Sequence, residues 1–283
     1  EIRPDITISL LRRDINFINK MKDGSIKLGE IHFNKSNYRE FSDNRLPAFV
    51  QHCVKKYWMW QLIRQVRQLK RFVVLSYEDA AEWTKLKNVA VIYNPLPFFP
   101  ERQSDGSSKQ VIAAGRYMPQ KGFDRLIDAW SIVNMQHPDW VLRIYGDGMR
   151  QQLQQQIDRL GIASSCILEH STPDIDEKYC ESSIFALSSR YEGFGMVIIE
   201  AMACGIPPVS FACPCGPRDI IDDGKNGLLV ENGNIEMLAG KICYLIENDE
   251  IRRKMGQQAR IDVERFKIEQ IAGQWKELFE SLV

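Results

Sequence analysis

Residues 184–211, IFALSSRYEGFGMVIIEAMACGIPPVSF, decide the fold class of this chain. The apolar run Ile184–Ser188 predicts a buried strand, and a polar, glycine-rich loop follows it. A helix is expected over about 195–203, and Pro208–Phe211 predicts the next strand. Two buried strands joined by one helix are typical of a parallel pair, because a parallel connection has to cross from one end of the sheet to the other.

The same alternation continues on both sides of this stretch. Further strands are predicted at Gln110–Gly115, Trp140–Tyr145, Cys166–Leu168 and Leu228–Val230. Helices are predicted at about 123–133, 149–160 and 175–181 and near 218–222, with three more helical stretches at the end of the chain. Strands separated by helices of this length predict an α/β fold, with a parallel sheet covered by helices on both faces.

The first hundred residues show only half of such a pattern. Strands are predicted at Asp5–Leu10, Phe72–Ser76 and Val89–Tyr93, with another near Gly29–His32 and a helix over His52–Arg71. Residues 94–110 contain three prolines and then a polar run, which is typical of a linker. We therefore expect a partial first domain at 1–100, preceded by a missing N-terminal section, and a second domain at 101–283 that includes the C-terminal helices.

The formal net charge of zero hides an asymmetry between the two parts. Residues 1–100 carry an excess of seven positive charges and residues 101–283 an excess of seven negative ones, so the first part is suited to an anionic partner. Residues 52–71 hold six Lys and Arg and no acid, and their apolar side chains share one helical face: Trp58, Met59, Leu62, Ile63, Val66 and Leu69. Our hypothesis is that this helix rests on an anionic membrane surface. The alternative is a helix packed on the first sheet with its charges in water.

The sequence favours a cytoplasmic protein without a metal. It holds seven cysteines, an odd number that lies mostly in apolar segments, which favours buried thiols over disulfides. Cys213 and Cys215 form a C-x-C, but no second pair stands nearby at zinc spacing. A D-x-D at Asp174–Asp176 follows Thr172-Pro173 at a predicted helix start, where we expect it to cap the helix. No apolar run approaches the roughly 20 residues that span a bilayer.

Residues 115–122, GRYMPQKG, place two cations at the carboxyl end of a predicted strand. Gly115 ends the strand, and Arg116 and Lys121 follow it before a helix begins near residue 122. Parallel sheets bind their ligands at the carboxyl ends of their strands. Two permanent positive charges beside a helix N-terminus suit a diphosphate. The alternative is a loop with two solvated basic side chains.

Residues 189–200, SRYEGFGMVIIE, place two carboxylates around a second such loop. Gly193 and Gly195 allow backbone N–H groups to approach a ligand closely, and the following helix directs its positive end to the same place. Glu192 lies on the loop and Glu200 lies among apolar residues of the helix, so the two can reach two ends of one ligand. Carboxylates bind sugar and ribose hydroxyls well, because each accepts two hydrogen bonds in a fixed plane.

An ordered series of motifs resembles the family 4 retaining glycosyltransferases. The series comprises G-R-x4-K-G at 115–122, Y-G-D-G at 145–148, S-R-Y-E-G-F-G at 189–195, E-A-M-A-C-G at 200–205, P-C-G-P-R-D-I-I at 214–221 and D-G-K-N-G-L-L-V at 223–230. Glu192 and Glu200 match the two acids of the E-x7-E motif of that family. The resemblance implies a GT-B fold, with two Rossmann-like doubly wound domains of which the N-terminal one is incomplete here.

The resemblance also implies a role for each matching residue. Arg116 and Lys121 would hold the diphosphate of the sugar donor, beside Gly115, and Glu200 would bind the ribose hydroxyls. Glu192 would lie by the transferred sugar, and the backbone amides of Gly193, Phe194 and Gly195 would hold sugar and phosphate. Residues 170–172 would border the base, and His32, in the loose match EIHFN, would approach the sugar from the first domain.

The activity that the resemblance implies is metal-independent transfer of a sugar with retention, without a cofactor. Glu192, Arg116 and Lys121 would be the catalytic residues, acting as charge builds on the leaving diphosphate. The substrates would be a UDP-sugar and a saccharide or lipid-linked acceptor in polysaccharide or lipopolysaccharide synthesis. The basic helix over 52–71 adds the hypothesis that the protein is anchored at the inner face of a bacterial membrane. Nucleic acid is not expected as a partner. Two alternatives are a nucleotide-sugar 2-epimerase of the same architecture and a truncated fragment that binds the sugar donor without transfer.

Overall fold

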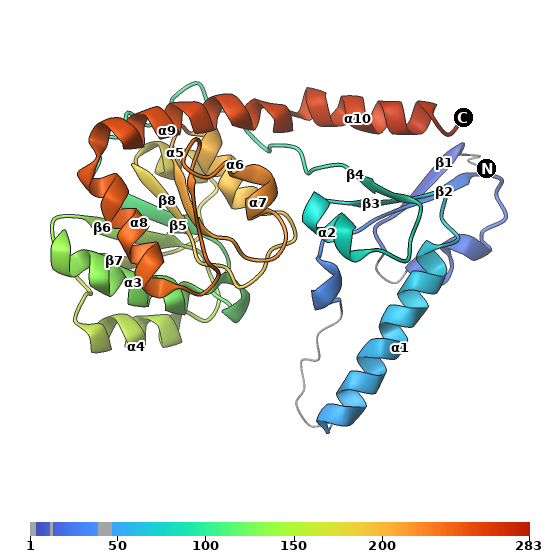
Figure 1. The fold of residues 1–283 in the computed structure, drawn as a ribbon, viewed down its shortest axis with the longest axis horizontal. Coiled ribbons are helices and arrows are strands. Elements are labelled where there is room, and N and C mark those ends of the chain that lie inside the picture. Colours follow the sequence, from blue (N-terminus) through green and yellow to red (C-terminus); the bar gives the residue numbers. More distant parts are fainter. Residues whose placement is uncertain (1–3, 12–13, 39–46) are drawn as a thin grey trace. The chain divides into compact units, whose positions relative to one another are not determined.

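The structure, a computed structural model, describes residues 4–11, 14–38 and 47–283. These residues form two compact units (Figure 1). One unit joins the described part of the chain up to Asn94 with Ile271–Val283, and the other spans Pro95–Gln270. Each unit is built on its own parallel sheet, which confirms the predicted α/β fold. Among the described residues, no helix combines the length and the apolar character that crossing a bilayer requires.

The first unit has a sheet of four parallel strands in the order β1-β2-β3-β4. The strands are β1 Ile6–Ser9, β2 Ile26–Glu30, β3 Arg71–Val74 and β4 Val89–Val91. The helices are α1 Ala48–Val66, α2 Tyr77–Glu82 and most of α10 Ile268–Glu280, with short 3-10 turns at Asp14–Asn16, Ile18–Lys20 and Lys35–Asn37.

Two apolar clusters hold the first unit together. In the larger one, Phe72 of β3 packs edge-on against Trp83, with 4.9 Å between the ring centroids, and α1 adds its buried side chains. In the smaller one, Ile271 of α10 packs with Val73 and Ile92. Because of this second cluster, residues 271–283 belong to the first unit, whereas the sequence placed them with the domain at 101–283.

The second unit has a sheet of six parallel strands in the order β10-β9-β8-β5-β6-β7. The strands are β5 Gln110–Ala114, β6 Val141–Tyr145, β7 Cys166–Glu169, β8 Ile184–Leu187, β9 Pro208–Phe211 and β10 Leu228–Val230. The helices are α3 Phe123–Gln136, α4 Arg150–Leu160, α5 Ile175–Cys180, α6 Met196–Ala203, α7 Pro217–Ile220, α8 Ile235–Glu247 and α9 Asp249–Asp262, with 3-10 turns η4 Pro119–Lys121 and η5 Val263–Phe266.

The strand order of the second sheet reverses between β5 and β8, and we call the place where the loops after these two strands diverge the crevice. From β5 the chain proceeds outward through β6 to β7, and from β8 it proceeds outward on the other side through β9 to β10. Because crossovers between parallel strands are right-handed, the helices after β5 and after β8 cover opposite faces of the sheet. The loops that follow β5 and β8 therefore diverge, and ligands of such sheets bind at this point.

The predicted elements of the second unit agree with the structure to within one or two residues, except that the predicted first helix continues to Gln136. The first unit differs more. Its long helix was predicted over His52–Arg71 but spans Ala48–Val66, because the chain turns after it so that the Lys70 N–H can donate to the Lys27 carbonyl at 2.8 Å. Strand β2 covers residues 26–30 rather than 29–32, and helix α2 was not predicted.

Candidate functional site

The two loops that the sequence singles out meet at the crevice between β5 and β8. The first runs from Gly115 through η4 to α3, and the second runs from Ser188 to the start of α6. The Ser188 hydroxyl donates to the carbonyl of Lys121 at 3.0 Å, and the Arg190 N–H donates to the carbonyl of Gln120 at 2.8 Å. These bonds hold the two loops in a fixed relation to each other.

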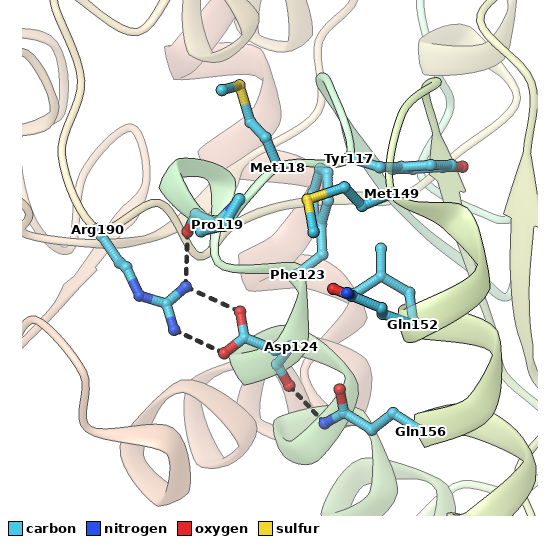
Figure 2. A pocket seen from close by; sticks show the side chains of 10 residues that line it. Tyr117, Met118, Pro119, Phe123, Asp124, Met149, Gln152, Gln156 and Arg190 are labelled. Atoms are coloured by element: carbon cyan, nitrogen blue, oxygen red, sulfur yellow. Dashed lines mark hydrogen bonds and ion pairs between the residues drawn. The ribbon is translucent and has the colours of Figure 1, made fainter. Parts of the chain in front are cut away.

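An ion pair between Arg190 and Asp124 adds a third connection between the loops. The guanidinium donates to both carboxylate oxygens, at 2.8 and 2.6 Å, and to the Pro119 carbonyl at 2.7 Å (Figure 2). The hydrogen bond and the charge of Arg190 hold the pKa of Asp124 below its usual range. Both residues line a pocket of about 250 Å³ together with Met118 and Phe123. Arg190 belongs to the motif S-R-Y-E-G-F-G at 189–195, but no role was predicted for it from the sequence.

Lys121 and Glu192 form an ion pair across the crevice. The Lys121 ammonium lies 2.8 Å from Glu192 Oε1, and the two side chains are only 15% and 6% exposed. The hydroxyl of Ser189, which is buried, donates to the same carboxylate oxygen at 2.6 Å. The structure thus brings together the predicted cation of the first loop and the predicted acid of the second. Sequence reasoning did not identify Ser189, although it stands three residues before Glu192 in the same motif.

Gly115 makes room for the side chain of Lys121. A Cβ atom on Gly115 would lie 3.3 Å from both Cδ and Cε of Lys121, and the backbone there has a φ of +153°. Gly195, directly before α6, adopts a φ of +98°, which a residue with a side chain rarely does. Both glycines therefore have a conformational reason to occupy their positions in the loops.

Glu200 lies on α6, close to the pair. The phenol O–H of Tyr179 donates to Glu200 Oε2 at 3.3 Å. Burial raises the pKa of Glu200, whereas the Tyr179 hydrogen bond and the positive charge of Lys121 lower it. Lys121 is therefore within electrostatic reach of both acids. Tyr179 lies 21 residues before Glu200 in the chain, and nothing in the sequence pattern pointed to this contact.

Arg116 and Phe194 differ from the other predicted residues. Arg116 is exposed, and its side chain makes no hydrogen bond or ion pair within the part of the chain that the structure describes. The Phe194 ring is buried and packs edge-on against Phe266, with 5.5 Å between centroids. Phe194 can therefore offer a ligand only its backbone, as Gly193 beside it can.

His32 lies in the first unit, in the loop after β2. Its Nε2 is 3.4 Å from Glu30 Oε1, and 45% of its side chain is exposed. Lys121, Glu192 and Glu200 all belong to the second unit. The approach of His32 to the sugar therefore stays a prediction.

The D-x-D segment does not cap its helix as predicted. Asp174 occupies the N-cap position of α5, but its side chain makes no capping hydrogen bond, and its own N–H donates to Thr172 Oγ1 at 3.2 Å. Near it, Asp147 binds the Nδ1 of His170 at 2.9 Å and the N–H of Ser171 at 3.3 Å. In the described ranges, no group of three or more His, Cys, Asp or Glu side chains is placed to hold a metal ion.

The apolar face of α1 packs into the first unit. Leu62, Val66 and Leu69 are buried in its core, and Trp58, Met59 and Ile63 pack against them. The prediction that this face of the helix meets a membrane is therefore wrong. The sequence could not distinguish the two cases, because a hydrophobic face has the same helical spacing whether it meets lipid or a protein core. The opposite side is exposed and carries Phe49, Tyr57 and Trp60, with the Arg64 guanidinium 5.5 Å from the Trp60 ring centroid.

A family model assigns the second unit. Residues 97–262, more than half of the chain, match the model described as glycosyl transferases group 1. The chain belongs to the glycosyl transferases group 1 family. The match covers both loops of the crevice, so the Lys121–Glu192 pair and Glu200 lie within the family domain.

Curated relatives are longer than this chain. An uncharacterized glycosyltransferase of Haemophilus influenzae is 33% identical over 73% of the chain and 60% of its own length. The amylovoran biosynthesis glycosyltransferase AmsD of Erwinia amylovora is 32% identical over 75% of the chain and 65% of its own length. The chain thus spans no more than about two thirds of these relatives.

Solved structures of GT-B glycosyltransferases share both sheets with this chain. The crystal structure of TarM matches 97% of the chain and 54% of its own length, with a TM-score of 0.82 and 26% identity. Anabaena HepE in complex with UDP and glucose matches 98% of the chain and 78% of its own length, with a TM-score of 0.79 and 21% identity. The two parallel sheets of the group 1 chain are therefore those of the GT-B fold.

Proposed function

We propose that this chain is the sugar-donor-binding part of a family 4 retaining glycosyltransferase, which moves a sugar from a UDP-sugar to a saccharide or lipid-linked acceptor. The observation that carries the proposal is the Lys121–Glu192 pair at the crevice between β5 and β8, with Glu200 within reach of the same ammonium. One cation between two acids matches a ligand that has a diphosphate in its middle and hydroxyls at both ends.

The diphosphate would lie over Lys121 and the N-terminus of α6. On binding, its oxygens would compete with Glu192 for the Lys121 ammonium, and Arg116, whose exposed side chain has no partner among the described residues, would supply the second cation. In transfer with retention, the glycosyl–phosphate bond ionises and negative charge builds on the leaving diphosphate. Positive groups already in place stabilise that charge. These side chains and the helix end can supply the positive charge, so the proposal includes neither a metal nor a cofactor.

The two acids would hold the hydroxyls on either side of the diphosphate. Glu200 would accept from the ribose, and Glu192 would lie by the transferred sugar with the backbone amides of residues 193–195. The chain near His170 would border the base. The hydrogen bonds from Ser189 to Glu192 and from Tyr179 to Glu200 support the roles proposed for these two carboxylates, because they fix the side chains in place.

Known proteins support this substrate class. The similar structure of HepE contains UDP and glucose, and one TarM structure contains UDP and a saccharide. AmsD is named for amylovoran biosynthesis, and a Staphylococcus aureus relative, 29% identical over 90% of the chain and 51% of its own length, is a poly(ribitol-phosphate) α-N-acetylglucosaminyltransferase. We infer that the acceptor is a cell-surface polymer or its lipid-linked precursor.

A thermal-shift screen with UDP, UDP-glucose and UDP-N-acetylglucosamine tests the proposal. A ligand that binds only the folded protein raises the transition temperature. We expect a rise with at least one of these compounds that disappears in Lys121→Ala and in Glu200→Ala. Lys225→Ala is the matched control, since this lysine is exposed and pairs with nearby Asp222. Equal shifts in all four proteins would contradict the assignment, and an epimerised nucleotide-sugar after incubation would favour an epimerase instead.

We also propose that the enzyme works at the inner face of a bacterial membrane, in contact with it through the exposed side of α1. That side combines Phe49, Tyr57 and Trp60 with the exposed cations Lys56 and Arg64. Aromatic rings and lysines together suit an interface that contains anionic lipid.

Flotation with vesicles that contain phosphatidylglycerol tests this contact. Lys56→Glu/Arg64→Glu should float less than the wild type, because both cations lie beside the exposed aromatic rings. Lys109→Glu/Lys225→Glu makes the same change in charge at exposed positions of the second unit and should float normally. Equal flotation of all three proteins would end the membrane proposal.

A further inference from the structure

Tyr179 stands behind Glu200 in the interface of α5 with α6. The two helices are in contact, and Figure 1 shows them side by side in the second unit. The Tyr179 ring is completely buried and packs edge-on against Phe185 of β8, with 5.9 Å between ring centroids. From this fixed ring the phenol O–H donates to Glu200 Oε2 at 3.3 Å.

We propose that Tyr179 is a positioning residue that holds the Glu200 carboxylate in the orientation in which it receives the ribose hydroxyls. The proposal rests on the proposed function, because it takes Glu200 as the residue that meets the nucleotide. It deepens that function by naming a residue that would touch no substrate and would act through Glu200 alone.

The geometry explains why a carboxylate at this place needs a partner. A glutamate has three rotatable side-chain bonds, and two adjacent hydroxyls are bound well only when both carboxylate oxygens lie in one fixed plane. A hydrogen bond from a rigid, buried ring removes part of that freedom before the ligand arrives. At 3.3 Å the bond is long for an O–H to oxygen contact, and because the phenol is neutral, the carboxylate keeps its negative charge.

Electrostatics gives Tyr179 a second effect on the same carboxylate. Burial raises the pKa of Glu200, and the groups that oppose the rise are Tyr179 and Lys121. The pKa of Tyr179 itself is well above its usual value, first because the ring is buried and then because Glu200 is charged. Tyr179 therefore keeps its proton across the pH range of an assay and always donates to Glu200.

The raised pKa of Glu200 determines how stability and UDP affinity change with pH. The fold favours protonated Glu200, so this group contributes stability below its unfolded pKa and loses that contribution as pH rises through its folded pKa. Ribose binding requires the ionised form, so UDP affinity falls as pH drops through the raised pKa. Removal of the Tyr179 hydroxyl takes a hydrogen bond from the ionised form, so the pKa rises further and this midpoint moves to higher pH.

Calorimetric titration of UDP between about pH 5 and pH 8 tests the proposal in the wild type, Tyr179→Phe and Tyr117→Phe. We expect Tyr179→Phe to bind UDP about fivefold more weakly at neutral pH, the effect of one hydrogen bond, with the midpoint moved to higher pH. Tyr117 is an equally buried tyrosine whose hydroxyl donates to the Ile144 carbonyl at 2.6 Å, so Tyr117→Phe should leave the midpoint unchanged. A structural loss alone would lower affinity without moving the midpoint.

Glu200→Gln and the double variant Glu200→Gln/Tyr179→Phe distinguish a failure of the role proposed for Tyr179 from a failure of the nucleotide site. Glu200→Gln should bind UDP weakly and should lack the acidic midpoint, and adding Tyr179→Phe should cost little more. If Glu200→Gln weakens binding while Tyr179→Phe binds as the wild type does, the role of Tyr179 is refuted and the nucleotide site stands. If neither substitution weakens binding, the site assignment fails and the proposal fails with it.

Discussion

Replacing Lys121 or Glu192 alone should destabilise the second unit, because it breaks their ion pair. Replacing both residues together should restore part of the lost stability. The charges are 2.8 Å apart on side chains that are 15% and 6% exposed. Removing one partner of a buried pair costs about 3–5 kcal/mol of unfolding free energy, because the other charge stays buried without its counter-charge. Ser189 still donates to the stranded carboxylate in Lys121→Met, so we expect a loss of about 3 kcal/mol, at the low end of that range.

Differential scanning calorimetry measures this loss in the second unit. For a unit the size of Pro95–Gln270, 1 kcal/mol corresponds to about 2–4 °C, so Lys121→Met should lower its transition by roughly 6–12 °C. Glu192→Gln should lower it by less, because a stranded lysine can move its ammonium toward water. The double variant should be more stable than the sum of the single changes implies, with a coupling of about 1–3 kcal/mol.

Lys109→Met provides the control for this cycle. Lys109 pairs with Asp139 at 2.5 Å, but their side chains are 62% and 55% exposed, so the pair contributes little. We expect its transition to stay within about 2 °C of the wild type. If Lys121→Met behaves like this control, or if the double variant equals the sum of the single ones, the crevice pair is solvated and the reasoning is refuted.

Three further outcomes follow from the structure. Gly115→Val should weaken UDP binding about tenfold by calorimetry, because the new side chain meets that of Lys121 and displaces a charged contact. Unchanged binding would show that Gly115 does not contribute to the nucleotide site. Phe194→Ala should lose about 3–4 kcal/mol in urea unfolding, since its buried ring leaves a cavity against Phe266, while Phe194→Leu should lose much less. Only Cys53 is exposed among the seven cysteines, so native protein should show one fast thiol with a thiol-specific reagent and seven in urea; several fast thiols would contradict the packing of the second unit.

The second unit could be predicted well because its central strands β5, β8 and β9 are buried on both faces. Such strands are short apolar runs between glycines, prolines and polar loops, as in Pro208–Phe211, and they leave a clear signal. The meeting of Lys121 with Glu192 followed from the same pattern, because the carboxyl ends of neighbouring parallel strands lie at one edge of the sheet.

Other features could not be derived, because sequence spacing does not say what a side chain meets. The apolar face of α1 suits a membrane and a protein core equally, and the structure packs it into the core. The motif that contains Phe194 places it between two glycines that we predicted to bind a ligand, yet its ring belongs to the core. Tyr179 and Glu200 are on different helices, so only the folded chain reveals their hydrogen bond.

A crystal structure with UDP bound tests the central claim most directly. The account predicts the diphosphate over the N-terminus of α6 within hydrogen-bonding distance of the Lys121 ammonium, with the ribose hydroxyls on the Glu200 carboxylate. A nucleotide bound instead in the pocket beside Met118 and Phe123, with Lys121 still paired to Glu192 and distant from any phosphate, would contradict it.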